Sequence, residues 1–139
     1  MHTFVLQEWT TIRGASGGTG NPGLTIVQSE RGWLDLSPFQ DLFAWVDVRE
    51  TTPGVTSNIN LFFDTSPTED ENFFVSMTGV NVPVISGLVA ATTPVIIKLP
   101  MLTAAVPLAR FLRWRLFSTV SQTWDVTMRI VVAANSPGM

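Results

Sequence analysis

Apolar and polar residues alternate with a period of two along much of this chain, and this pattern constrains its fold most strongly. Residues 124–132 show it best, because one face of that run is apolar throughout: Trp124, Val126, Met128, Ile130 and Val132. Successive side chains of a β-strand point to opposite faces, so a period of two predicts a strand, whereas a helix needs a period of 3.6. Patterns of helical period are almost missing from the sequence, which indicates an all-β protein.

The same alternation recurs and predicts about eight strands. The long runs are residues 41–50, 58–64, 95–99, 110–117 and 124–132, and the shorter ones are residues 3–9, 24–29, 33–36 and 73–77. Proline and glycine turn signals separate the runs at intervals typical of sandwiches and barrels. We therefore expect an antiparallel two-sheet sandwich of jelly-roll or Greek-key type. Residues 78–93 are expected to form a loop, and residues 37–42 are the one candidate for a short helical turn.

The chain of 139 residues is long enough for one domain and short for two. No repeat or linker divides it, so residues 1–139 are expected to form a single β-sandwich domain. Residues 10–23 contain five glycines and are expected to form a long Gly-rich loop or arm after the first strand. Connections of that length are often functional.

Composition suggests that part of the surface is covered by a partner. Hydrophobic residues make up 45% of the chain but charged residues only 14%, against about 25% in ordinary soluble domains. Large apolar surfaces on such a chain are typical of interaction sites. The net charge of -3 gives no basic footprint for nucleic acid. With no cysteine, the chain lacks a disulfide framework, a thiol nucleophile and a cysteine-based zinc site.

Catalytic machinery is not recognisable, and we predict that the protein is not an enzyme. His2 is the one histidine and lies at the terminus, where an oriented catalytic base is not expected. The Gly-rich segment lacks the lysine of a phosphate-binding loop. Residues 64–71 are acidic but lack calcium-loop spacing, so they are interpreted as a solvated hairpin loop. Asp47 and Asp125 are expected to pair with neighbouring arginines. No cofactor and no metal site are predicted.

Aromatic and arginine side chains supply the candidate interface. Trp114 and Trp124 are in phase with leucine and valine and are assigned to the core. Trp45 shares its strand face with Asp47 and Arg49, and the run 110–117 has a mixed phenylalanine and arginine face of the kind found at protein interfaces. The candidate interface residues are Trp45, Arg49, Phe111, Arg113, Arg115 and Phe117.

Several segments together resemble a known family. They are Trp33-Leu34-Asp35-Leu36-Ser37, residues 43–48, the segment 60–68 with its Asp-Thr-Ser-Pro-Thr sequence, Phe111-Leu112-Arg113-Trp114 and residues 124–130. This order resembles small β-sandwich virion accessory proteins, of the capsid-decoration type, of tailed bacteriophages. The resemblance implies a structural, homo-oligomeric subunit that stabilises a capsid, with the major capsid protein as partner. It also implies a virion location after assembly in the host cytoplasm.

A second function class remains open. The same strand-and-turn pattern occurs in carbohydrate-binding jelly-roll modules, for example on a phage tail, where an exposed tryptophan such as Trp45 would stack on a sugar. On the first interpretation we expect no small-molecule substrate, no nucleic acid and no membrane partner. The N-terminus lacks the basic region of a signal peptide, and the longest apolar stretches are interrupted by Pro83, Gly87 and Pro94.

Overall fold

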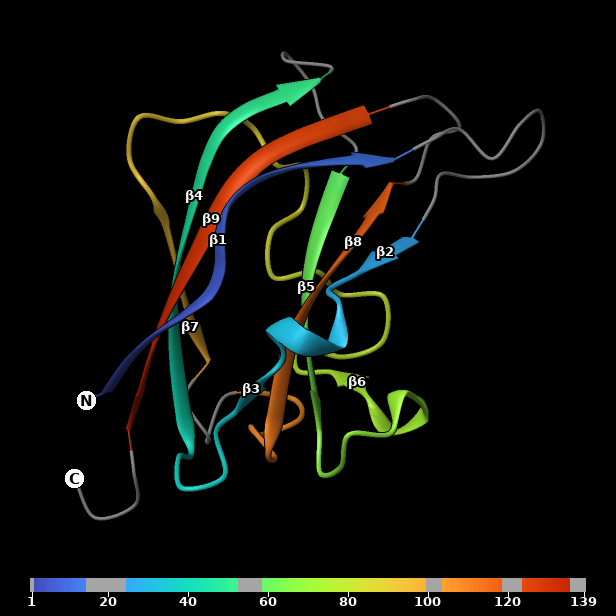
Figure 1. Ribbon diagram of the computed structural model, residues 1–139, viewed down its shortest axis with the longest axis vertical. Coiled ribbons are helices and arrows are strands. Elements are labelled where there is room, and N and C mark those ends of the chain that lie inside the picture. The colour runs from blue at the N-terminus through green and yellow to red at the C-terminus, as the bar shows by residue number, and fades with distance from the viewer. Residues whose placement is uncertain (1, 15–24, 53–58, 100–103, 119–123, 136–139) are drawn as a thin grey trace.

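The computed structural model describes residues 2–14, 25–52, 59–99, 104–118 and 124–135, which form two antiparallel β-sheets packed face to face (Figure 1). The strands are β1 (His2–Gly14), β2 (Thr25–Val27), β3 (Leu34–Asp35), β4 (Asp41–Thr52), β5 (Ile59–Ser66), β6 (Val75–Ser76), β7 (Val95–Leu99), β8 (Phe111–Ser118) and β9 (Trp124–Asn135). Two short 3-10 turns, η1 (Glu30–Gly32) and η2 (Glu71–Phe73), lie between strands. The all-β sandwich predicted from the alternation is confirmed.

The strand order identifies the sandwich as a jelly roll. Sheet A has the order β1-β9-β4-β7 and sheet B the order β2-β8-β5-β6. Strand β5 pairs with one edge of β8 along the full length of β5. Strands β2 and β3 also pair with β8 and therefore lie along its opposite edge. The nine strands thus occupy eight positions, with η1 interrupting one of them. Two four-position sheets exchanging strands in this order are the arrangement of an eight-stranded jelly roll.

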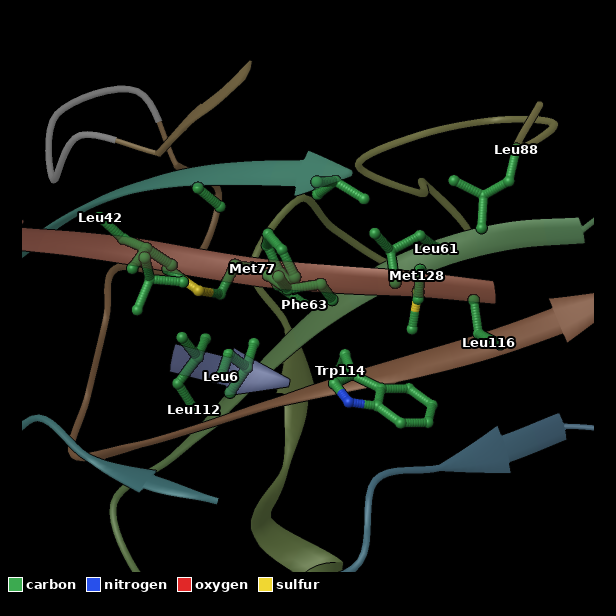
Figure 2. Close-up of a cluster of buried hydrophobic side chains, with 14 of the residues drawn as sticks. Leu6, Leu42, Leu61, Phe63, Met77, Leu88, Leu112, Trp114, Leu116 and Met128 are labelled. Atoms are coloured by element: carbon green, nitrogen blue, oxygen red, sulfur yellow. The ribbon is translucent and has the colours of Figure 1, made fainter. Parts of the chain in front are cut away.

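Alternate residues of the long strands meet in the space between the sheets. From sheet A, Leu42, Val46 and Met128 are fully buried, and from sheet B so are Phe63 and Leu116. Figure 2 shows side chains from both sheets pointing into this shared core, with Met77 and Leu88 from loop segments closing it. Trp114 and Trp124 are buried in it, as predicted. The apolar phase read from the sequence is therefore the inward face of each long strand.

Gly14 ends β1 directly against the indole of Trp124. The two residues are paired across β1 and β9, and a Cβ placed on Gly14 would lie 2.1 Å from Trp124 Cε2. Any larger side chain would displace the fully buried ring, because the interior has no free volume to receive it. This glycine permits a close approach of backbone and ring.

Gln28 ties the two sheets together. Its side-chain amide donates to the carbonyl of Leu6 in sheet A (2.6 Å) and to that of Gly32 (2.9 Å), while its Oε1 accepts from the backbone N–H of Trp114 in sheet B (3.2 Å). The Nε1 of Trp33 donates to the Gln28 carbonyl (2.9 Å). Buried polar groups need such partners, and here they fix η1 and Trp33 against sheet B.

Several sequence-based boundaries are wrong. Residues 10–14 belong to β1 and pair with β9, so the first part of the expected Gly-rich loop is strand; residues 15–24 lie outside the described residues. Residues 37–42 hold a turn and the start of β4 instead of a helical turn. In the expected strand 73–77, the pairing is confined to Val75–Ser76, because Phe73 lies in η2. The loop expected at 78–93 is confirmed, apart from an isolated bridge between Ile85 and Leu61.

Candidate interaction surfaces

Four of the six candidate interface residues lie on the outward face of β8 in sheet B, and the chain itself largely covers them. Phe111 and Arg113 are each 6% exposed, and Arg115 and Phe117 are half-buried. The guanidinium of Arg113 lies 4.1 Å from the ring centroid of Phe74 and 5.6 Å from that of Trp33, and the guanidinium of Arg115 lies 4.1 Å from that of Phe62. Aromatic rings carried by the neighbouring strand and by the segments after η1 and η2 thus cover this face.

Asp64 of β5 neutralises Arg113 and Arg115 of the neighbouring strand β8. Its Oδ2 accepts from the Nε of Arg115 at 3.0 Å and from the Nε of Arg113 at 3.3 Å, and its side chain is 3% exposed. Glu71 lies 3.7 Å from the Nη1 of Arg113, a buried nitrogen with no hydrogen-bond partner. The expectation that residues 64–71 form a solvated loop is wrong for Asp64, Thr65 and Ser66, which are buried in β5.

The outward face of sheet A carries an uncovered apolar row. Cross-strand pairing aligns Val5 of β1, Val131 of β9, Trp45 of β4 and Ile96 of β7 in one line across all four strands. Trp45 and Val131 alternate with fully buried residues, so their side chains point away from the core. Ile96 is 53% exposed and Val5 45% exposed. We call this set the apolar row.

A charged and aromatic cluster adjoins the apolar row. Asp47 is ion-paired with Arg129 across β4 and β9 at 3.6 Å, which confirms the expected pairing of Asp47. Trp9 of β1 lies beneath two guanidinium groups, with Arg49 at 4.8 Å and Arg129 at 5.0 Å from its ring. We call Trp9, Asp47, Arg49 and Arg129 the bulge cluster, because register shifts in β1 and β4 flank it.

Two of the six candidate interface residues, Trp45 and Arg49, lie on the outward face of sheet A. Their role at an interface stays a prediction. The candidate set did not include Trp9 and Val5 of β1 or Ile96 of β7, two strands far apart in the sequence. Their exposed apolar character was readable, but their adjacency depends on the order β1-β9-β4-β7.

Further exposed apolar side chains lie away from sheet A. Phe73 and Val75 flank the start of the edge strand β6. Val80, which is 86% exposed, lies at a turn in which Gly79 and Asn81 have positive φ angles. The exposed apolar side chains of the described residues are therefore divided among separate sites.

Among the residues that the structure describes, no three histidine, cysteine, aspartate or glutamate side chains are grouped so that they would hold a metal ion. The same residues include no helix with the length and apolar character needed to cross a bilayer.

Neither a protein-family model nor a curated protein matches the sequence. The fold does match solved structures. The structure of the VP2 subviral particle of infectious bursal disease virus aligns with a TM-score of 0.51 and 11% identity, over 99% of this chain and 32% of that chain. A structure of the Gx strain of the same virus aligns with a TM-score of 0.45 and 12% identity, over the same shares of the two chains.

The first likeness defines the class of fold. This chain is a β-sandwich of the type found in a viral capsid protein, and it spans about one third of the VP2 chain that it matches. The jelly-roll strand order established above agrees with that class. At 11% identity the likeness is one of architecture, so function has to be argued from the surfaces of this chain.

Proposed function

We propose that the protein is a structural subunit of a virus particle. The proposed role is that of a capsid decoration or stabilising subunit of a tailed bacteriophage, working as a homo-oligomer against the major capsid protein. The sequence resemblance to phage virion accessory proteins supports the finer assignment, and the capsid-type jelly roll supports the broader one.

The uncovered apolar row carries the proposal. Trp45 and Ile96 lie side by side on the outward face of sheet A, with Val131 and Val5 continuing the row across β9 and β1. Burying a fully exposed valine or isoleucine side chain contributes about 1.5–3 kcal/mol, and the row would gain part of this per residue, because Val5 and Ile96 are about half exposed and Trp45 and Val131 are half-buried. Tryptophan and arginine are also enriched at the centres of protein interfaces. A neighbouring subunit that covered the row would gain this energy without any change in the fold.

Such a subunit would act by forming interfaces with its neighbours in the particle. The jelly roll supplies a rigid plate, because its two sheets share one core and are tied by Gln28. Covering the row on one side and contacting a second neighbour through Phe73 or Val80 would link adjacent subunits. Added interface area raises the free energy needed to separate the particle's components.

Sedimentation velocity and co-sedimentation with capsids test the proposal. Wild-type protein is expected to self-associate and to pellet with particles, and Ile96→Asp is expected to abolish both, because a carboxylate would be desolvated in the interface. Thr25→Asp, at an exposed position in sheet B, is the matched control and should behave as wild type. A wild-type protein that stays monomeric and never pellets with particles would contradict the proposal.

The structure argues against Trp45 as the sugar-binding residue of the carbohydrate-binding alternative. Trp45 lies between Val131 and Ile96, so the polar groups that a sugar needs are not beside its ring on those two sides. Polar groups are concentrated in the bulge cluster, at the end of β4. A glycan function of this fold is therefore better sought there than at Trp45.

A further inference from the structure

Two irregularities in sheet A converge on Arg129. In β1 the register shifts between Gln7 and Thr10, which places Glu8 and Trp9 opposite Arg129 alone. In β4 it shifts between Val48 and Glu50, so Arg49 is the extra residue of a β-bulge. Bulges re-aim side chains and are frequent beside binding sites. Here they direct Trp9 and Arg49 toward each other across β9.

A pocket opens next to this cluster. Its volume is about 450 Å³, and it is lined by Asp47, Arg49, Ala90, Ala91 and Thr92. The segment before β7 forms its second wall, held to β4 by a hydrogen bond from the Ala91 N–H to the Val48 carbonyl (3.0 Å). This volume is within the range of small-molecule sites. The small side chains of Ala90 and Ala91 leave room for a compact ring.

Arg49 supplies the pocket with hydrogen-bond donors that have no acceptor. Within the described part of the chain, its side chain forms no ion pair and no hydrogen bond, and its one interaction is with the face of Trp9. Stacking uses the face of a guanidinium and leaves its in-plane N–H groups free. The other charged lining residue, Asp47, is paired with Arg129. The free N–H groups of Arg49 favour an acceptor-rich anion.

The charge of the cluster narrows the choice of anion. Of the two charged residues that line the pocket, Asp47 is already paired with Arg129, so Arg49 leaves one positive charge to be balanced, which a monoanion does and a phosphate dianion exceeds. A planar carboxylate also matches the fork of a guanidinium in a bidentate pair. Hydroxyl groups beside it would donate to Asp47 or accept from Thr92, and the Ala90 and Ala91 methyls suit the C–H face of a sugar ring.

We propose that this pocket binds a carboxylated monosaccharide, with Arg49 pairing with the carboxylate and Asp47 and Thr92 contacting the hydroxyls. Trp9 is a positioning residue, because it holds the guanidinium of Arg49 in a fixed plane. The site is separate from the apolar row and does not depend on the proposed assembly role.

Titration of the ¹⁵N-labelled full chain with glucuronate, followed by amide chemical shifts, tests the site. Glucuronate is expected to shift the amides of Ala90, Ala91 and Thr92 in a saturable manner, and glucose, which lacks the carboxylate, is expected to bind at least about tenfold more weakly. Arg49→Gln should weaken glucuronate binding by a similar factor. Arg31→Gln, an exposed arginine of η1 in the other half of the sandwich, is the matched control and should leave it unchanged.

Trp9→Leu separates positioning from direct contact. The variant removes the cation–π contacts of Trp9 with Arg49 and Arg129, and loss of the contact with Arg49 should weaken glucuronate binding by about threefold while leaving the response to glucose unchanged. Thermal unfolding of each variant would show that the fold is retained. The proposal is overturned if glucose shifts the same amides as strongly as glucuronate, if Arg49→Gln binds glucuronate as tightly as wild type, or if no amide of residues 90–92 responds.

Discussion

The outward faces of the two sheets carry similar acidic, arginine and aromatic side chains, but these are covered on sheet B and more exposed on sheet A. On sheet B, Asp64 and two arginines lie beneath Trp33 and Phe74, and the chain's own 3-10 turns hold the covering rings in place. On sheet A, Asp47 pairs with Arg129 beside Trp9, and this cluster is more open, since the side chain of Arg129 is 41% exposed against 7% for Arg113. The contrast shows that arginine and aromatic content alone does not mark an interface, because a face already closed by its own chain offers little to a partner.

The same contrast revises the candidate interface. Phe111 and Arg113 have their aromatic and ionic partners within the chain, so they act first as elements of the fold. Trp45 and Arg49 lie on the open face and keep the role proposed for them. Arg115 and Phe117 lie between these cases, half-buried at the end of β8 nearer to β2.

The largest expected loss of stability comes from removing the Asp64 carboxylate on the outward face of sheet B, which we call the closed face; the outward face of sheet A is the open face. Asp64→Ala leaves the buried guanidinium of Arg113 and the half-buried one of Arg115 without their carboxylate, which costs about 3–5 kcal/mol of unfolding free energy. The matched change on the open face, Asp47→Ala, removes a partly exposed pair and should cost less than about 1 kcal/mol. Urea unfolding measures both values. Equal losses would refute the distinction between the closed and open faces.

A smaller effect is expected from loosening the cover of sheet B. Gln28→Leu removes partners from Leu6, Gly32 and Trp114 and should cost about 2–3 kcal/mol. It should also release η1 and Trp33, so that Arg113 reacts faster with phenylglyoxal. Gln7→Leu, which removes one hydrogen bond to the Trp114 indole, is the control and should cost about 1 kcal/mol without exposing Arg113. Unchanged reactivity in the Gln28 variant would show that η1 does not depend on this side chain.

The smallest effect concerns an exposed pair at the margin of sheet B. Arg110 donates to Asp35 at 3.0 Å and, together with hydrogen bonds from Ser37, lowers the pKa of Asp35 from 3.8 to about 2. Because the folded-state pKa is depressed, the stabilisation is complete above pH 3.8 and is lost as the pH falls through about 2. NMR titration of the Asp35 carboxyl group would measure this, and Arg110→Gln should return the pKa toward 3.8. A pKa unchanged in that variant would contradict the assigned cause.

Much of the interior was predictable. Alternation along β4 and β9 assigned Leu42, Val46 and Met128 to the inward face, and the buried tryptophans followed from their phase with neighbouring leucine and valine. Short segments were less predictable, since β2, β3 and β6 are two or three residues long and their pairing is decided by β8 and β5. Of the apolar row and the bulge cluster, sequence singled out Trp45 and Arg49 as interface candidates, because the members from β1 and β7 become their neighbours only through the sheet order.

Asp64 shows most directly what sequence could not supply. It ends the expected strand 58–64 and begins the acidic stretch 64–71, so local sequence leaves it between a strand and a solvated loop. The structure continues β5 to Ser66 and places Asp64 opposite Arg113, where charge compensation offsets the cost of burial.

By itself, the sequence determined an all-β sandwich, the inward face of its long strands and a surface short of charge, because a period of two and the balance of apolar residues are local properties. Tertiary structure alone decided the jelly-roll order, the closure of sheet B over its arginines, and the meeting of Trp9 with Arg49 across two bulges. Those features depend on which strands become neighbours, and that is set by long-range pairing between residues more than a hundred positions apart, such as Val5 and Val131.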